Sequence, residues 1–211
     1  MAITYPIALT SLRTPRSVVI RKRSVVGSQS SSFTLQPQVY AWSGQLWEAE
    51  VTLPPMKRAE AEAWIAALIS MNGREGSMLL GPDYANQSPR GIGTGTPLVN
   101  GAGQTGYDLI TDGWTLNQTG IMKAGDWFQL GSGTSARLYK VMADANSSGL
   151  GTGGATLTIW PKLRSIPADN DPLTITSPKG RFMLSSNETE WAIDQASFYG
   201  LSFGASEDLR P

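Results

Sequence analysis

The chain contains no cysteine and no histidine, so carboxylates, hydroxyls and amines are the groups left to do chemistry. This absence excludes disulfides and thiolate ligands, and it removes the commonest general base and metal ligand. Glu48 and Glu50 stand two positions apart in a segment of alternating polarity, which places their carboxylates roughly 7 Å apart on one strand face. Such a pair could supply a general acid and a base, but nothing nearby suggests a raised pKa or a sugar cleft. We therefore interpret both as a solvated or subunit-facing surface and predict no catalytic residue.

Three short patterns resemble ligand-binding motifs but lack the required context. Gly101–Gly106 matches the dinucleotide-binding pattern G-x-G-x-x-G, which needs a helix directly after it to receive the pyrophosphate. Residues 107–113 are short, end in glycine and predict a strand instead. Asp144–Gly149 and Asp169–Asp171 offer oxygens to a hard cation, but neither is followed by the glutamate that completes a calcium loop. Polar β-turns explain both, and we expect no cofactor and no metal.

A cationic run and a set of aromatic residues could in principle bind nucleic acid or sugar. The run consists of Arg21, Lys22 and Arg23 and could contact phosphates. Four aromatic residues of the middle region could stack on bases or sugars: Trp114, Trp127, Tyr139 and Trp160. Their positions in predicted strands favour a role in the core.

The carboxylates Glu48 and Glu50 belong to the strand around which the rest of the chain is organised. Alternate residues on its other face are apolar, which is typical of a half-buried strand, and they are Trp47, Ala49, Val51 and Leu53. Pro54 and Pro55 cannot donate to a ladder, so the strand is expected to end there.

A helix is predicted directly after the prolines, over residues 57–72. Trp64, Ala67, Leu68 and Met71 recur at helical spacing, and Ala63 widens the apolar stripe. The pair Asn72-Gly73 predicts a left-handed C-terminal stop. We expect the following residues to be core or structural positions of the strand and helix: Trp47, Val51, Leu53, Pro54, Pro55, Trp64, Leu68 and Gly73.

Composition indicates a turn-rich, mainly β protein with no overall charge. The 211 residues include 23 glycines and 13 prolines, 40% are hydrophobic, and the formal net charge is zero. No apolar stretch is long enough to span a bilayer, so we expect no contact with a membrane and synthesis in a cytoplasm.

Short strands separated by glycine-rich turns fill most of the remaining chain. A turn is expected at Ser43-Gly44, between two extended segments, and a polar loop at residues 28–32. A composition shift after Pro82 suggests a domain boundary, beyond which the strands predict a small β-barrel or sandwich. The last 35 residues are too few to bury a core alone. We therefore predict a mainly β protein with one discontinuous β-sandwich domain, residues 1–84 and 177–211, which contains the helix. Residues 85–176 are predicted to be inserted as a small β-barrel domain, OB-like or a sandwich.

Three runs around the organising strand carry a resemblance to a known family. They are G-Q-L-W-E-A-E-V-T-L-P-P-M from residue 44, A-E-A-W-I-A-A-L from residue 61 and N-G-R-E-G-S-M-L-L-G-P-D from residue 72. Over residues 38–83 the chain resembles the distal tail proteins and related tail-tip proteins of long-tailed bacteriophages. The layout is also similar to smaller members of that family, in which a barrel-like insertion interrupts a ring-forming β domain.

The resemblance implies a structural subunit of the virion tail tip and no enzymatic activity. It implies a ring, commonly of six copies, that joins the tail tube to the hub, fibre or receptor-binding apparatus and leaves a channel for DNA. The protein would be made in the cytoplasm of the host bacterium. Alternatives are a carbohydrate-binding module for host attachment, a single-stranded nucleic-acid-binding barrel, and a different tube or tube-terminating protein of the same tail.

The distribution of charge along the chain suggests how copies would associate. No acidic residue precedes Glu48, whereas acids dominate after Glu188. A closed ring needs two complementary patches on each subunit, so we take the following residues as the candidate subunit interface: Arg21, Lys22, Arg23, Glu48 and Glu50. Pairing of these charges within one chain is the alternative.

Overall fold

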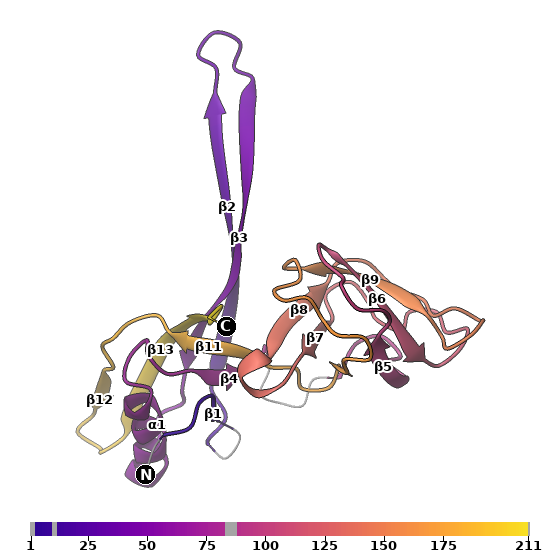
Figure 1. Cartoon of the computed structure of the whole chain (residues 1–211). Helices are drawn as coiled ribbons and strands as arrows, with labels where there is room; N and C mark the ends of the chain where they lie inside the picture. The colour runs from indigo at the N-terminus through magenta and orange to yellow at the C-terminus, as the bar shows by residue number, and fades with distance from the viewer. Residues whose placement is uncertain (1–2, 10–11, 83–87, 211) are drawn as a thin grey trace.

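The computed structural model describes residues 3–9, 12–82 and 88–210. In this part of the chain the strands form a sheet of seven and a sheet of six, accompanied by one α-helix. Figure 1 shows two bodies side by side, one around each sheet, with a long hairpin projecting from the first. The fold class is mainly β, as composition predicts.

The seven-stranded sheet combines strands from both ends of the chain. Its order is β1-β4-β11-β13-β3-β2, and β12 pairs separately with β13. Strand β13 lies between β11 and β3, antiparallel to both. The strands are β1 (Ile7–Ala8), β2 (Ser17–Ser30), β3 (Pro37–Thr52), β4 (Met78–Leu80), β11 (Gly180–Leu184), β12 (Trp191–Ile193) and β13 (Tyr199–Glu207). The C-terminal strands therefore share a sheet with the N-terminal ones, while the predicted division into two folding domains stays a prediction.

Strands β2 and β3 form one continuous hairpin, so the turn expected at Ser43-Gly44 is wrong. Ser24 pairs with Gln45, but the next pair is Val26 with Ala41, so the residues between them form a bulge. A Cβ on Gly44 would lie 2.7 Å from Val25 Cγ2, and this close approach is the reason for glycine there. The chain reverses at residues 31–36 instead, and residues 28–30 of the expected loop belong to β2.

Helix α1 (Arg58–Ser70) is slightly shorter than the predicted span. It buries Ala61, Trp64, Ile65 and Leu68, whereas Ala63 is exposed, so the apolar stripe is rotated from the expected one. Asn72 and Gly73 have φ angles of 49° and 64°. The helix therefore ends in the left-handed conformation that this pair predicts.

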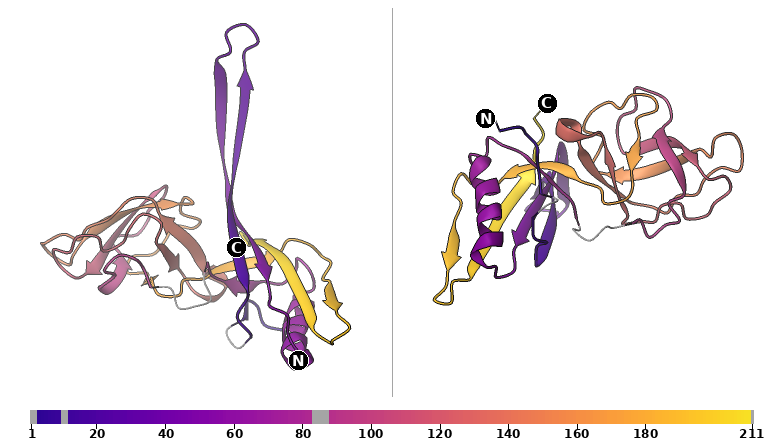
Figure 2. Two further views of the ribbon diagram at one scale, coloured as in Figure 1. Left: turned by 180° about the vertical axis from the view of Figure 1, so that it is seen from behind. Right: turned by 90° about the horizontal axis from the view of Figure 1, so that it is seen from below.

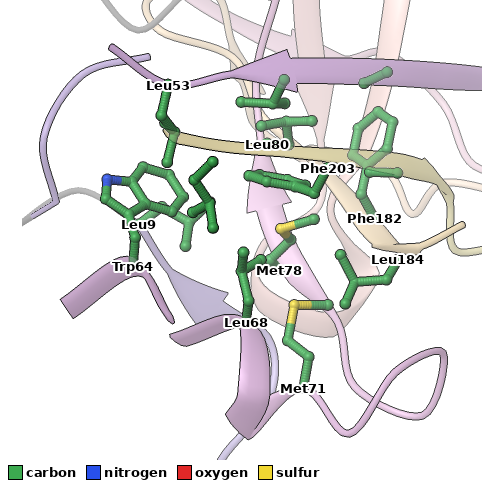
Figure 3. Packing of buried hydrophobic residues seen from close by; sticks show 14 of the residues in the cluster. Leu9, Leu53, Trp64, Leu68, Met71, Met78, Leu80, Phe182, Leu184 and Phe203 are labelled. Carbon is green, nitrogen blue, oxygen red and sulfur yellow. The ribbon is translucent and has the colours of Figure 1, made fainter. Parts of the chain in front are cut away.

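The core of the first body lies between α1 and the inner face of the seven-stranded sheet. Figure 3 shows Trp64 and Leu68 of the helix pointing toward Leu53 and Phe203 of the sheet. The Trp64 ring is 5.9 Å from that of Phe203, and its indole N–H donates to the carbonyl of Arg13. All five core positions predicted on large side chains are buried: Trp47, Val51, Leu53, Trp64 and Leu68. Pro54 is half-buried and Pro55 exposed, so they end the strand rather than fill the core.

The six-stranded sheet curls into a nearly closed barrel in the order β10-β7-β8-β9-β6-β5. Its two end strands, β10 and β5, meet at a β-bridge between Leu98 and Pro172. Beside it, the Val99 N–H donates a hydrogen bond to the Asp171 carbonyl. Trp114 and Tyr139 lie in the barrel core. The elements are β5 (Gly95–Val99), β6 (Asp108–Trp114), β7 (Trp127–Leu130), the short 3-10 helix η1 (Gly133–Ser135), β8 (Arg137–Val141), β9 (Ala155–Trp160) and β10 (Leu173–Thr174).

Three tryptophans join the barrel to the seven-stranded sheet. The Trp47 ring lies 4.7 Å from that of Trp127 and 4.3 Å from that of Trp160. Its indole N–H donates to the carbonyl of Leu138 in β8. Trp127 and Trp160 therefore pack outside the barrel core, against the organising strand.

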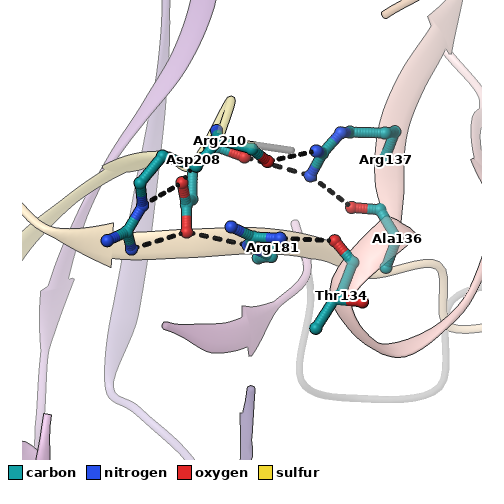
Figure 4. Close-up of polar contacts among 6 residues, drawn as sticks. All are labelled: Thr134, Ala136, Arg137, Arg181, Asp208 and Arg210. Carbon is teal, nitrogen blue, oxygen red and sulfur yellow. Dashed lines mark hydrogen bonds and ion pairs between the residues drawn. The ribbon is translucent and has the colours of Figure 1, made fainter. Parts of the chain in front are cut away.

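A buried ionic network near the C-terminus makes a second connection between the bodies (Figure 4). The Asp208 carboxylate accepts from Arg181 at 2.7 Å and from Arg210 at 2.8 Å. Arg137 of the barrel donates to the carbonyls of Asp208 and Arg210. Burial alone would raise the pKa of Asp208, but hydrogen bonds from Arg210 and Arg181 outweigh it and hold this pKa well below its ordinary value.

Candidate assembly interface

The outer part of the β2–β3 hairpin, residues 24–46, contains no charged residue. We call this segment the distal hairpin. It extends away from both bodies in Figure 1 and in the view from behind in Figure 2. Its large apolar residues are exposed: Val25, Val26, Phe33, Leu35, Val39, Tyr40 and Trp42.

Two of these exposed side chains, Tyr40 and Trp42, pack on the hairpin itself. The ring of Trp42 lies across Gly27, where an added Cβ would come within 2.8 Å of it. Tyr40 packs beside Trp42 with ring centroids 6.5 Å apart. The distal hairpin thus presents a shaped apolar surface.

The two long edges of the distal hairpin carry backbone groups without a further strand in the described chain. Strand β2 is the last strand of its sheet, and β13 pairs with β3 only from Glu48 to Thr52. Proteins normally protect such edges with charged residues or proline. Here the one proline is Pro37, at the first position of β3. Exposed large apolar side chains beside unprotected strand edges are typical of an interaction site.

The base of the hairpin brings together the charged residues predicted for the interface. Arg21 pairs with Glu50 at 2.7 Å and Arg23 pairs with Glu48 at 3.1 Å, across the strands of one chain. These four residues were expected to pair either between subunits or within one chain, and in the structure they pair within one chain. Lys22 faces the other side of β2, with its ammonium 5.9 Å from the centre of the Trp160 ring.

The acidic residues of the C-terminal region divide into two groups. Glu207 pairs with Arg164, and Asp208 pairs with Arg181, and all four side chains are buried. Glu188 and Glu190 are exposed beside β12. Glu207 and Asp208 are therefore already neutralised within the chain, while association of copies through their oppositely charged ends stays a prediction.

The remaining motifs behave as turns and loops. Residues 101–106 form a loop that Gln104 holds through bonds to the backbone of Gly101 and Ile110, and strand β6 follows it. Asp144 and Asp169 accept backbone N–H groups of Ala124 and Gly101. Over the described ranges, no group of three or more Asp or Glu side chains could hold a metal ion.

Two features of the structure were not predicted from the sequence. The first is the length of the hairpin, which the absence of charge between Arg23 and Leu46 could have indicated. The second is a groove beside Trp127 and Trp160, which depends on the packing of barrel against sheet and leaves no local pattern.

Two comparisons with known proteins identified no family for this chain. No family model matches the chain, and a search of curated proteins found no match. No helix of the described residues has the length and apolar character to cross a membrane.

Proposed function

We propose that the protein is a non-enzymatic structural subunit of the tail tip of a long-tailed bacteriophage, and that its copies assemble into a ring. The observation that carries this proposal is the distal hairpin, an uncharged two-stranded arm that projects from a folded body and exposes seven large apolar side chains. The proposed location and number of copies come from the resemblance over residues 38–83. It implies six copies that join the tail tube to the hub, fibre or receptor-binding apparatus around a DNA channel.

The physical argument begins with the cost of leaving such an arm in water. Fully burying one large apolar side chain contributes roughly 1.5–3 kcal/mol, and seven such side chains are exposed on the hairpin. A two-stranded ribbon is also only marginally stable alone. Contact with a neighbouring subunit would cover the apolar side chains and pair the free strand edges.

The charged residues at the hairpin base support a structural role rather than a catalytic one. Glu48 and Glu50 each form an ion pair with an arginine. These pairs tie the two strands together at the base of the distal hairpin, which is a structural role.

Removal of the distal hairpin tests the proposal. Ser24 and Gln45 are paired across the ladder, so an Asn-Gly turn between them should close a short hairpin. We expect this variant to keep cooperative thermal unfolding and sediment as a monomer, while the full chain sediments as a ring that electron microscopy resolves.

A matched control removes an exposed apolar side chain elsewhere. Leu150 is 83% exposed in a barrel loop, and Leu150→Ser should leave assembly unchanged. A full chain that stays monomeric at high concentration, or a shortened variant that still forms the ring, would contradict the proposal. Labelling a tagged copy on virions would test its location at the tail tip.

A further inference from the structure

A groove of about 570 Å³ lies between the edge strand β2 and the barrel. We call it the tryptophan groove. Val18 and Ile20 of β2 line one side, and Trp127 and Trp160 of the barrel line the other. Strand β2 is the last strand in its sheet order, so among the described residues its backbone edge beside the groove has no neighbouring strand.

Two lysines stand at this apolar groove. The ammonium of Lys140 is 4.6 Å from the centre of the Trp127 ring, and that of Lys22 is 5.9 Å from Trp160. Neither forms an ion pair with a carboxylate of the described residues. An occupant that brings apolar side chains flanked by carboxylates would match this chemistry.

The segment around β12, residues 188–194, has the complementary character. Its sequence is Glu-Thr-Glu-Trp-Ala-Ile-Asp, with Trp191 and Ile193 exposed by 41% and 55%. Glu188 and Glu190 are exposed and make no ion pair with a described residue. Strand β12 pairs with β13 only, which leaves its other edge open.

The two surfaces lie on opposite sides of one molecule. Figures 1 and 2 show β12 on the side of the first body that faces away from the barrel, whereas the groove faces the barrel. A contact between them within one chain is therefore excluded. Two different, complementary patches on opposite sides are what a closed ring with head-to-tail interfaces requires.

We propose that the tryptophan groove receives the β12 segment of a neighbouring copy of this chain. This inference rests on the proposed function and names the contact that would orient the ring. Trp191 and Ile193 would cover the apolar walls, and Glu188 and Glu190 would pair with Lys22 and Lys140. The free edge of β12 could also add to the edge of β2 by strand pairing.

Charge exchange between the two surfaces tests the contact. The double variant Lys22→Glu, Lys140→Glu should raise the concentration for half-assembly by about tenfold or more, because like charges then face one another. The double variant Glu188→Lys, Glu190→Lys should raise the concentration for half-assembly by a similar factor. The variant with all four changes should return to within about threefold of the full chain, since each interface again has opposite charges. Sedimentation over a concentration series measures all three.

Exposed lysines away from the groove provide the matched control. Lys57→Glu together with Lys123→Glu makes the same change in net charge and should leave assembly unchanged. The β12 contact is overturned if ring assembly is unchanged in both the Lys22→Glu, Lys140→Glu variant and the Glu188→Lys, Glu190→Lys variant. It is also overturned if the fourfold variant does not recover assembly. In either case the proposed function stands.

A peptide titration covers the case in which the full chain itself fails to assemble, which would overturn the proposed function. A synthetic peptide of residues 186–196 is then titrated against the full chain, with tryptophan fluorescence as the readout. Saturable binding that weakens about tenfold in the Lys22→Glu, Lys140→Glu variant keeps the groove assignment. Absence of binding, or equal binding of a peptide with lysine at positions 188 and 190, overturns it.

Discussion

Trp47 belongs to both bodies of the molecule. Its position in β3 follows the apolar alternation of that strand, and its ring contacts Trp127 and Trp160 of the barrel. Its backbone N–H donates to Glu207, whose carboxylate also pairs with Arg164. One side chain thus couples the organising strand, the barrel and the C-terminal strand, and so helps to set the angle between the bodies.

Replacing Trp64 tests the core at the scale of one residue. The side chain is fully buried against Phe203 and its N–H is hydrogen-bonded. Trp64→Ala should lower the free energy of unfolding by about 3–5 kcal/mol. Ile69→Ala removes an exposed residue of the same helix and should change it by less than about 0.5 kcal/mol. Urea unfolding followed by circular dichroism measures both, and equal midpoints would show that Trp64 is not a core contact.

Asp208 gives a pH-dependent contribution to stability. Its pKa is lower in the folded chain than in the unfolded chain, so the contribution is present above about pH 4 and declines as the pH falls toward the folded pKa. Asp208→Asn leaves Arg181 buried without its partner and should cost about 3–5 kcal/mol at pH 7. Between pH 5 and pH 2, unfolding free energy should fall less steeply in this variant.

The control for Asp208 is an exposed ion pair of α1. Glu62 pairs with Arg58 at i,i+4, and Glu62→Gln should cost no more than about 0.5 kcal/mol. An Asp208→Asn chain as stable as the full chain at pH 7 would contradict the assigned role of the network.

At the scale of elements, the β2–β3 hairpin consists of two parts with different chemistry. The inner part carries the Arg21–Glu50 and Arg23–Glu48 pairs on its outer face and apolar residues on its inner face. The distal hairpin is uncharged and exposes seven large apolar side chains among serine and glutamine residues. The bulge opposite Val25 separates the two parts, so the strand changes from a sheet strand to a projecting arm at that position.

The end of α1 provides a prediction at the same scale. Gly73 has a φ of 64°, and an added Cβ would lie 2.7 Å from Asn187 Oδ1 and 2.9 Å from Asn187 Cα. Gly73→Ala should therefore destabilise the chain by more than the roughly 1–2 kcal/mol of left-handed strain alone. Gly101 has a φ of 90° with open space around it, so Gly101→Ala should cost only that strain. Thermal melting compares the two, and equal losses would exclude the clash.

At the scale of the whole molecule, the C-terminal strands complete a sheet begun by the N-terminal ones. Leu80 of β4 pairs with Gly180 of β11, so the chain leaves the first body and returns to it at adjacent strands. The barrel lies between these two points in the sequence. This arrangement brings strands from both ends of the chain into the first body while the barrel stays to one side (Figure 2).

Excision of the barrel tests the predicted domain division. A short Gly/Ser linker in place of residues 86–176 should leave a core that melts cooperatively, since β4 and β11 remain neighbours. Its melting temperature should be lower, because Trp47 and Arg181 lose their barrel partners. Deleting residues 177–211 removes β11, β12 and β13, which leaves β4 and β3 without the strands that join them, and should unfold residues 1–84. Cooperative melting of that truncated chain would contradict the division.

Local patterns in the sequence determined the secondary structure near the organising strand. The alternation from Trp47 to Leu53, the stop at Pro54 and the helix end at Asn72-Gly73 all depend on neighbouring residues, so each could be predicted. Helix bounds and the orientation of its buried face were less accurate, because Ile65 and Ala61 are buried by contacts with distant strands. The Ser43-Gly44 signal was misassigned because a glycine that allows a bulge and one that allows a turn look alike until the partner strand is known.

Tertiary structure alone decided which charged residues are left unpaired and which apolar residues are left exposed. The sequence shows five basic residues before Glu48 and an acidic C-terminal region, but only strand register pairs Arg21 with Glu50 and only packing buries Glu207 beside Arg164. Lys22, Glu188 and Glu190 remain without carboxylate or cation partners in the described chain for the same reason. The physical cause is that pairing and burial depend on distances between residues far apart in the chain, which composition and periodicity do not contain.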